Sequence, residues 1–298
     1  MTTRACLIVN PAAGRGRGAR LLPAAAQAFA AHGITDVRLT VAPGDEARQV
    51  RAAVDSGCDT IAVLGGDGTW SKAAAELARL GAPARLALLA AGTGNDFVKN
   101  LPEPSRDAEA MARLVAGDAD ERRIDMAAVD GQWFLNVAGF AFDVAVLART
   151  ERMRWLSGTA LYAAAAVQEL FAYAGLEVAI DGAAASRYLL LAFANGAHFG
   201  GAFHVAPGAR IDDGLLDAIA IPDIGRLGRP GLLARAARGT HLRHPRVTAR
   251  RAAAFTLRFA EPPVYEVDGE LRRAASAEVR VESRPGVLRV LVPRGSAG

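Results

Sequence analysis

The segment TIAVLGGDGT, residues 60–69, decides how the first part of the chain folds. A short apolar run with the length and composition of a buried strand leads directly into two glycines, an aspartate, a third glycine and a threonine. A helical pattern follows from Ser71. A plain turn needs one glycine rather than three around an acid, so this order predicts a strand, a ligand-binding loop and a helix.

The same alternation continues on both sides of this segment. The predicted strands are ACLIVN, VRLTV, TIAVLGG and RLALLA, and the predicted helices cover residues 19–31, 45–56, 71–80 and 96–101. Strands that alternate with helices form βαβ units. We therefore predict a doubly wound α/β domain with a mainly parallel sheet over residues 1–125.

After Arg122 the pattern changes to short alternating segments, which Asp-Gly pairs at 130, 181, 213 and 268 separate. This pattern is typical of an antiparallel β-sandwich, which we place over residues 126–298. Helical insertions are expected at 144–173, as two helices broken near Ser157 and Gly158, and at 226–239. The last strand, 287–292, could pair with either domain.

Length and composition agree with two globular domains. The chain has 298 residues, of which 51% are hydrophobic and 22% charged, which excludes a disordered or fibrous protein. A net charge of +4 suits anionic partners such as nucleotides or acidic lipid headgroups. Two cysteines, Cys6 and Cys58, form neither a disulfide framework nor a zinc motif and favour the cytoplasm. We expect no signal peptide and no transmembrane segment, because the longest apolar stretch, 160–167, is too short.

Two more glycine-containing loops follow predicted strands. NPAAG, residues 10–14, matches neither the phosphate loop nor the dinucleotide fingerprint and would alone be an ordinary turn. GTGNDF, residues 92–97, contains Asn95 and Asp96, either of which could simply cap a helix. Open α/β sheets bind ligands at these strand ends. GGDGT and GTGNDF are neighbouring loops, and each contains glycines, a threonine and an acid. Together they predict a nucleotide phosphate site, where Asp67 can hold magnesium or its water.

The order of motifs resembles the diacylglycerol kinase catalytic-domain family, which includes bacterial lipid kinases and the sphingosine and ceramide kinases. The resemblance rests on NPAAG, TVAPGD at 40–45, GGDGT, GTGNDF, NVAGFAFD at 136–143, the block NGAHFGGAFHVAPGARIDDGLLD at 195–217, and VDGE at 267–270. GGDGT alone is shared with NAD kinases, but the full order is similar to the lipid-kinase branch.

The resemblance implies a kinase of phospholipid biosynthesis that uses ATP and Mg²⁺ to phosphorylate a diacylglycerol-like lipid at a membrane surface, with no nucleic-acid partner. It implies ATP contacts from Asn10, Thr40, Gly65, Gly66, Asp67, Gly68, Thr69, Trp70, Ser71, Thr93 and Asn95. Asp67 and Asp96 would belong to the magnesium network. Asp213, with the backbone carbonyls of Arg210 and Leu215, would hold a second, structural magnesium.

By the same resemblance, Asp268 and Glu270 would be the acid pair in a cleft between the two domains. A carboxylate that accepts the proton of an alcohol makes it a better nucleophile, and Glu270 is favoured slightly on family grounds. Without the resemblance, Asp268-Gly269 would indicate only a hairpin turn.

The chain departs from the family at several positions. The family commonly follows GGDGT with a hydrophobic residue, Asn and Glu, where this chain has Trp70, Ser71 and Lys72, and Ala141 replaces a usual glycine. Three alternatives stay open: a kinase for another lipid such as phosphatidylglycerol or a sphingoid base, an NAD kinase-like enzyme, and a non-catalytic nucleotide-binding protein.

The sequence leaves membrane contact open too. The run at 226–251 is rich in arginine and contains no acid, so it is either a solvated surface or a surface for anionic headgroups on the inner face of the membrane. The sequence does not indicate an oligomeric state.

Overall fold

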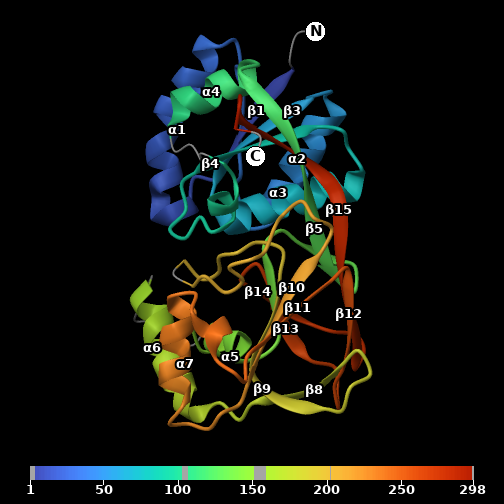
Figure 1. The fold of residues 1–298 in the computed structure, drawn as a ribbon. Coiled ribbons are helices and arrows are strands. Elements are labelled where there is room, and N and C mark those ends of the chain that lie inside the picture. The colour runs from blue at the N-terminus through green and yellow to red at the C-terminus, as the bar shows by residue number, and fades with distance from the viewer. Residues whose placement is uncertain (1–3, 103–106, 151–158, 202, 297–298) are drawn as a thin grey trace. The chain divides into compact units, whose positions relative to one another are not determined.

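The computed structural model describes residues 4–102, 107–150, 159–201 and 203–296. The chain divides into two compact units (Figure 1). Unit 1 consists of residues 1–126 and 285–298, and unit 2 of residues 127–284.

Unit 1 is a parallel sheet with helices on both faces. Its strands are β1 (Ala5–Val9), β2 (Asp36–Leu39), β3 (Thr60–Gly65) and β4 (Arg85–Ala90), in the order β2-β1-β3-β4, and the end of β15 (Glu278–Pro293) pairs in parallel with β4. Its helices are α1 (Ala13–Ala31), α2 (Asp45–Asp55), α3 (Asp67–Leu80) and α4 (Ala108–Ala116). Phe29 of α1 and Met111 of α4 share a core with Leu7, Leu64 and Leu89 of the sheet. Helices α2 and α3 lie on the other side of the strands (Figure 1), so the predicted doubly wound lobe is confirmed.

Two of the helix predictions in unit 1 need correction. Helix α3 begins at Asp67 rather than at Ser71, so most of GGDGT forms its first turn. The segment 96–101 contains only the single 3-10 turn Phe97–Asn100, because Leu101 precedes Pro102 and takes the extended backbone that a residue before proline prefers.

Helix α4 is absent from the sequence predictions. It is preceded by Asp107, whose carboxylate accepts hydrogen bonds from the N–H groups of Glu109 (3.1 Å) and Ala110 (3.4 Å). This is a standard side-chain cap for the free amides of a first turn.

Unit 2 is built from antiparallel strands. They are β5 (Ala119–Val129, which begins in unit 1), β6 (Gln132–Phe134), β7 (Val137–Gly139), β8 (Leu176–Ile180), β9 (Ser186–Ala194), β10 (Leu216–Pro222), β11 (Thr248–Ala252), β12 (Ala254–Arg258), β13 (Val264–Val267), β14 (Glu270–Arg273) and the first part of β15. The order is β14-β13-β7-β9-β8-β12-β15, and β10 joins β9 to β11. Asp130, Asp181 and Asp268 have positive φ, and each precedes a glycine that also has positive φ, as predicted for turns between strands.

The side chains of β9 alternate between two cores. Leu191 and Phe193 pack with Phe140 and Phe255 between the strands. Ala192 and its neighbours on the opposite face are covered by α5 (Phe142–Thr150), α6 (Thr159–Ala172) and α7 (Arg229–Ala237). The predicted antiparallel sandwich with helical insertions is therefore confirmed. The predicted break near residues 157 and 158 lies outside the described residues.

Among the described helices, none combines the length and the apolar character needed to cross a membrane.

Candidate functional site

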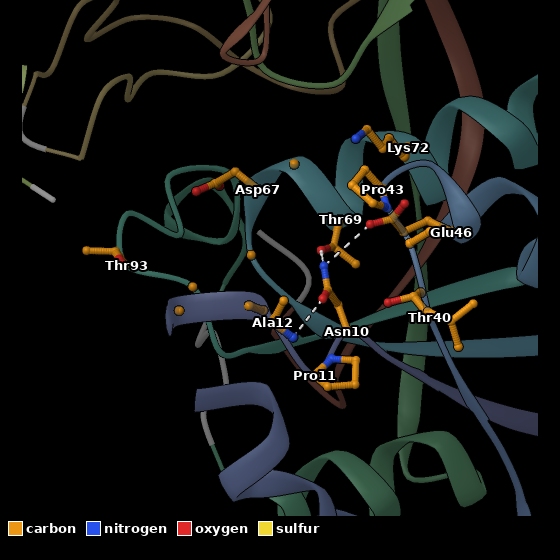
Figure 2. A pocket seen from close by; sticks show the side chains of 17 residues that line it. Asn10, Pro11, Ala12, Thr40, Pro43, Glu46, Asp67, Thr69, Lys72 and Thr93 are labelled. Carbon is orange, nitrogen blue, oxygen red and sulfur yellow. Dashed lines mark hydrogen bonds between the residues drawn. The ribbon is translucent and has the colours of Figure 1, made fainter. Parts of the chain in front are cut away.

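Unit 1 contains a cavity of about 630 Å³ at the carboxyl ends of its parallel strands (Figure 2). Its walls are the loops that follow β1, β2, β3 and β4. This is the edge at which open α/β sheets bind their ligands.

Asn10 connects three of these loops. Its Oδ1 accepts the N–H of Ala12 (3.0 Å), and its Nδ2 donates to Thr69 Oγ1 (2.9 Å) and Glu46 Oε1 (3.4 Å), as Figure 2 shows. The amide of Asn10 therefore holds the loops after β1, β2 and β3 in a fixed arrangement around the cavity.

The glycines allow the loops after β3 and β4 to touch. A Cβ on Gly66 would lie 2.9 Å from the Cα of Gly92, which is closer than real contacts allow. Asp67 Oδ1 also accepts the backbone N–H of Phe97 (3.0 Å). GGDGT and GTGNDF thus form one continuous wall of the cavity.

The local charges suit a polyphosphate with a divalent cation. The first turn of α3 carries Asp67, Gly68 and Thr69 at the cavity, so the positive end of the helix dipole faces this region. Lys72 of the same helix also lines the cavity. A hard carboxylate oxygen such as that of Asp67 is the ligand type that Mg²⁺ prefers.

The structure divides the predicted ATP contacts into two groups. Asn10, Thr40, Gly66, Asp67, Gly68, Thr69 and Thr93 line the cavity, whereas Gly65, Trp70, Ser71 and Asn95 do not. The Trp70 side chain is fully buried and donates from Nε1 to the carbonyl of Val63 (3.2 Å), so it packs α3 onto β3. Asn95, with φ of 47°, donates to the carbonyl of Gly92 (2.9 Å) and shapes its loop.

Two charged lining residues, Glu46 and Lys72, were not predicted as contacts. Glu46 lies just after TVAPGD, and Lys72 is one of only two lysines in the chain. The sequence signal for Lys72 is its rarity, but the resemblance identifies it only as a departure from the family and not as a contact.

Asp96 has a different environment from Asp67. It is buried, its Oδ1 accepts from Lys99 Nζ (2.6 Å), and it does not line the cavity. The residues present therefore fit a magnesium ion through Asp67 more directly than through Asp96.

Within the described residues, one group of three metal-ligating side chains comes together, and it lies elsewhere. Cys6, Asp36 and Cys58 converge at the amino ends of β1, β2 and β3, the edge opposite to the cavity. Asp36 is already paired with Arg38 (2.6 Å), and burial raises the pKa of the Cys6 thiol. Thiols beside an arginine do not suit magnesium.

The predicted structural magnesium site in unit 2 contains one carboxylate. Asp213 Oδ1 accepts the N–H of Leu215 (3.0 Å), and its Oδ2 lies 3.8 Å from Arg251 Nη1. Arg210 pairs with Asp212 (3.3 Å). The oxygen donors suit magnesium, but Arg251 competes with any cation for Asp213.

Asp268 and Glu270 lie on the hairpin between β13 and β14, which we call the VDGE hairpin (residues 267–270). The Asp268 carboxylate accepts three backbone N–H groups, those of Leu135 (2.6 Å), Asn136 (2.9 Å) and Val137 (3.1 Å). Glu270 is about one-third exposed and pairs with Arg272 (2.5 Å). Asp268 therefore anchors the turn.

A second acid pair, Asp143 and Glu266, lies next to this hairpin and is absent from the sequence predictions. Glu266 is buried, Asp143 is partly buried, and the facing oxygens of the two carboxyl groups are both buried and close together. Burial raises the pKa of Asp143 to about 6, and burial together with the charge of Asp143 raises the pKa of Glu266. Because side chains alternate along β13, Glu266 points to the other face of the strand from the core residues Tyr265 and Val267. Helix α5 packs against β13.

Two family models match most of the chain. Residues 4–129 match the model of the diacylglycerol kinase catalytic domain, and residues 136–292 match that of the YegS C-terminal NAD kinase beta sandwich-like domain. The chain belongs to the diacylglycerol kinase catalytic-domain family.

Relatives in this family match over most of their length. A protein of Pseudomonas aeruginosa (strain UCBPP-PA14) named "Probable lipid kinase YegS-like" is 35% identical over 87% of this chain and 85% of its own. A protein of Mycobacterium tuberculosis (strain ATCC 25618 / H37Rv) named diacylglycerol kinase is 30% identical over 96% of this chain and 94% of its own. A crystal structure described as a diacylglycerol kinase from Bacillus anthracis (strain Sterne) shares the fold, with a TM-score of 0.73, 24% identity and 99% coverage of both chains.

Proposed function

We propose that this member of the diacylglycerol kinase family is an ATP- and Mg²⁺-dependent kinase that phosphorylates the hydroxyl of a diacylglycerol-like lipid. The observation that carries the proposal is the cavity of unit 1, where glycine loops and the first turn of α3 surround a space with Asp67 on its wall. Such a site suits a triphosphate, whose transfer depends mainly on positioning and charge stabilisation.

In this proposal ATP contacts the predicted residues that line the cavity, together with Lys72 and the amides at the start of α3. Asp67, directly or through water, would hold magnesium, and Asp96 would support it from behind the loop. When bound, the ion neutralises the charge that develops on the phosphates. Asn10 and Thr69 keep the loops in position, because their side chains are hydrogen-bonded to each other.

The VDGE hairpin supplies the acceptor side of the reaction in this proposal. Glu270 accepts the proton of the lipid hydroxyl as the phosphoryl group transfers, since it is partly exposed and Asp268 is occupied by three N–H donors. Asp268 keeps Glu270 in place. The carboxylate of Asp213 and the backbone carbonyls of Arg210 and Leu215 would hold a structural magnesium if the ion replaces Arg251 as the partner of Asp213.

Membrane contact of a peripheral kind is proposed for the surface made by the ends of α6 and α7. Arg229, at the start of α7, donates to the carbonyls of Leu170 (2.8 Å) and Tyr173 (2.9 Å) at the end of α6, so these ends lie together. Phe171 and Leu227, next to these contacts, are 49% and 96% exposed. Apolar side chains so exposed suit the boundary of a bilayer.

The same part of the sequence, residues 226–246, carries several exposed arginines. Arg226, Arg235, Arg238, Arg243 and Arg246 are exposed, and in the part of the chain that the structure describes they form no ion pair with a carboxylate. Each cation near an anionic leaflet contributes about 1 kcal/mol of attraction. This charge favours the inner face of the cytoplasmic membrane as the place where the enzyme meets its lipid.

The test is an assay of ATP consumption over a panel of acceptors in mixed micelles: diacylglycerol, phosphatidylglycerol, a sphingoid base and NAD. Consumption that depends on diacylglycerol supports the proposal. Consumption that depends on NAD alone would assign an NAD kinase-like activity, and ATP binding without any consumption would indicate a nucleotide-binding protein.

A further inference from the structure

We propose that Asp143 and Glu266 share one proton and act as a positioning pair that holds the VDGE hairpin in its turn. The catalytic consequence rests on the proposed function, because it concerns the placement of Glu270. The pair itself is a feature of unit 2 alone.

Gly139 of β7 leaves the space in which the two carboxyl groups meet. It pairs with Glu266 in the register of β7 and β13. A Cβ at this position would lie 1.4 Å from Asp143 Oδ2 and 2.9 Å from Glu266 Oε1. Both oxygens therefore occupy the volume that any larger residue would fill.

The hydrogen bonds around the pair require a proton between these two oxygens. Asp143 Oδ1 accepts the N–H of Ala141 (3.0 Å), and Glu266 Oε2 accepts the N–H of Gly269 (2.7 Å). Among the described residues, no donor reaches Asp143 Oδ2 or Glu266 Oε1, although both atoms are fully buried. Two ionised carboxylates there would repel each other in a medium of low dielectric, whereas one shared proton supplies the missing O–H donor.

The surroundings place the charge on Asp143 and the proton on Glu266. Asp143 lies in the first turn of α5, and backbone N–H groups of that turn lower its pKa against the effect of burial. Glu266 faces the negative charge of Asp143 and of Asp268, and both raise its pKa. Among the described residues, Tyr173 is a further titratable group near the pair, and burial together with the charge of Asp143 raises the pKa of its phenol.

The pair acts on the hairpin through Glu266. The 2.7 Å bond to the Gly269 N–H fixes the residue between Asp268 and Glu270. The shared proton is lost as the pH rises through the raised pKa of Glu266. Because folding raises the pKa of Glu266, its contribution to stability is fully present below the ordinary pKa of a glutamate and is lost as the pH rises through the raised pKa.

The experiment compares the wild type with Glu266→Gln, Glu266→Ala and the control Glu278→Gln, whose side chain is exposed. Difference infrared spectroscopy detects the carbonyl stretch of a protonated carboxyl group. Hydrogen exchange, followed by mass spectrometry across pH, reports the protection of residues 267–270. Turnover and the KM for ATP complete the set.

We expect a buried protonated carboxyl signal at neutral pH in the wild type and in Glu278→Gln, and its loss in Glu266→Gln. The glutamine can still donate to Asp143 and accept from Gly269, so Glu266→Gln keeps hairpin protection and turnover and removes their decline with rising pH. Glu266→Ala lowers both protection and turnover, turnover by about tenfold to a hundredfold, without changing the KM for ATP.

No protonated carboxyl signal in the wild type, or the same decline with rising pH in Glu266→Gln as in the wild type, would overturn the shared proton. Equal hairpin protection in Glu266→Ala and the wild type would overturn the positioning role. The infrared measurement on the wild type does not depend on any variant folding. If no lipid is phosphorylated, the proposed function fails, while the infrared and exchange measurements still decide whether the pair exists.

Discussion

Asp67 Oδ1 accepts a 3.0 Å hydrogen bond from the backbone N–H of Phe97, which joins the start of α3 to the loop after β4. One oxygen of the proposed magnesium ligand therefore also maintains the contact between the two glycine loops. A substitution that keeps this acceptor but removes the charge separates the two roles.

Asp67→Asn is that substitution. Its side-chain oxygen can still accept from Phe97, so we expect a cooperative unfolding transition close to that of the wild type. Turnover with Mg–ATP should fall by about a hundredfold to a thousandfold, because a preorganised charge at the phosphates is lost. Thermal unfolding and steady-state kinetics measure the two effects. A variant without cooperative unfolding would assign Asp67 a structural role instead.

Asp213→Ala tests the structural magnesium of unit 2. An ion that binds only the folded state stabilises it by mass action, by about 2.7 kcal/mol at a concentration of a hundred times its Kd. We expect magnesium to raise the Tm of the wild type and of Asp67→Asn by several degrees and to leave that of Asp213→Ala unchanged. If the wild type melts at one temperature with and without magnesium, Arg251 is the lasting partner of Asp213 and there is no such ion.

The two acids of the VDGE hairpin should respond differently to amide substitution. Asp268→Asn leaves at least one buried N–H without an acceptor, at a cost of about 1–3 kcal/mol, so both Tm and turnover should fall. Glu270→Gln should keep its Tm and its affinity for ATP. Its turnover should fall by about two to four orders of magnitude, toward the lower end because the transition state is loose. Near-normal turnover in both variants would show that the VDGE hairpin has no role in the reaction.

The surface at the ends of α6 and α7 can be tested by vesicle sedimentation. Leu227→Ser and Arg235→Glu should each weaken binding to anionic vesicles, the arginine change by at least about fivefold, and high salt should weaken binding of the wild type. Arg258→Glu is the matched control, because Arg258 is exposed but pairs with Glu278 on another strand. Equal binding of the wild type and all three variants, or binding that does not depend on salt, would contradict a role of this surface in membrane binding.

The sequence predicted the parts of the fold that have a strong period. The βαβ alternation and the Asp-Gly turns at 130, 181 and 268 were found because strand, glycine loop and helix signals are local. Helix α4 was missed because the prolines at 102 and 104 obscure the helical pattern that starts at Asp107. The segment 96–101 was predicted as a helix but contains only a 3-10 turn, because four residues are too few for a periodic pattern to distinguish the two.

The site was only partly predictable, because the sequence signals that identify it are local. Motifs identified the loops but not the direction of each side chain, so Trp70 was assigned to ATP although it packs into the core. The pairing of Asp143 with Glu266 depends on residues far apart in the chain that meet over Gly139. No local pattern reports such a long-range contact.

Lipid kinase activity is measured by the transfer of label from γ-labelled ATP to diacylglycerol in mixed micelles, followed by extraction and separation of the lipids. We expect a labelled phospholipid that requires both magnesium and diacylglycerol and that falls sharply in Asp67→Asn and Glu270→Gln. Label that never enters any lipid of the panel, from a protein that is folded and binds ATP, would contradict lipid kinase activity.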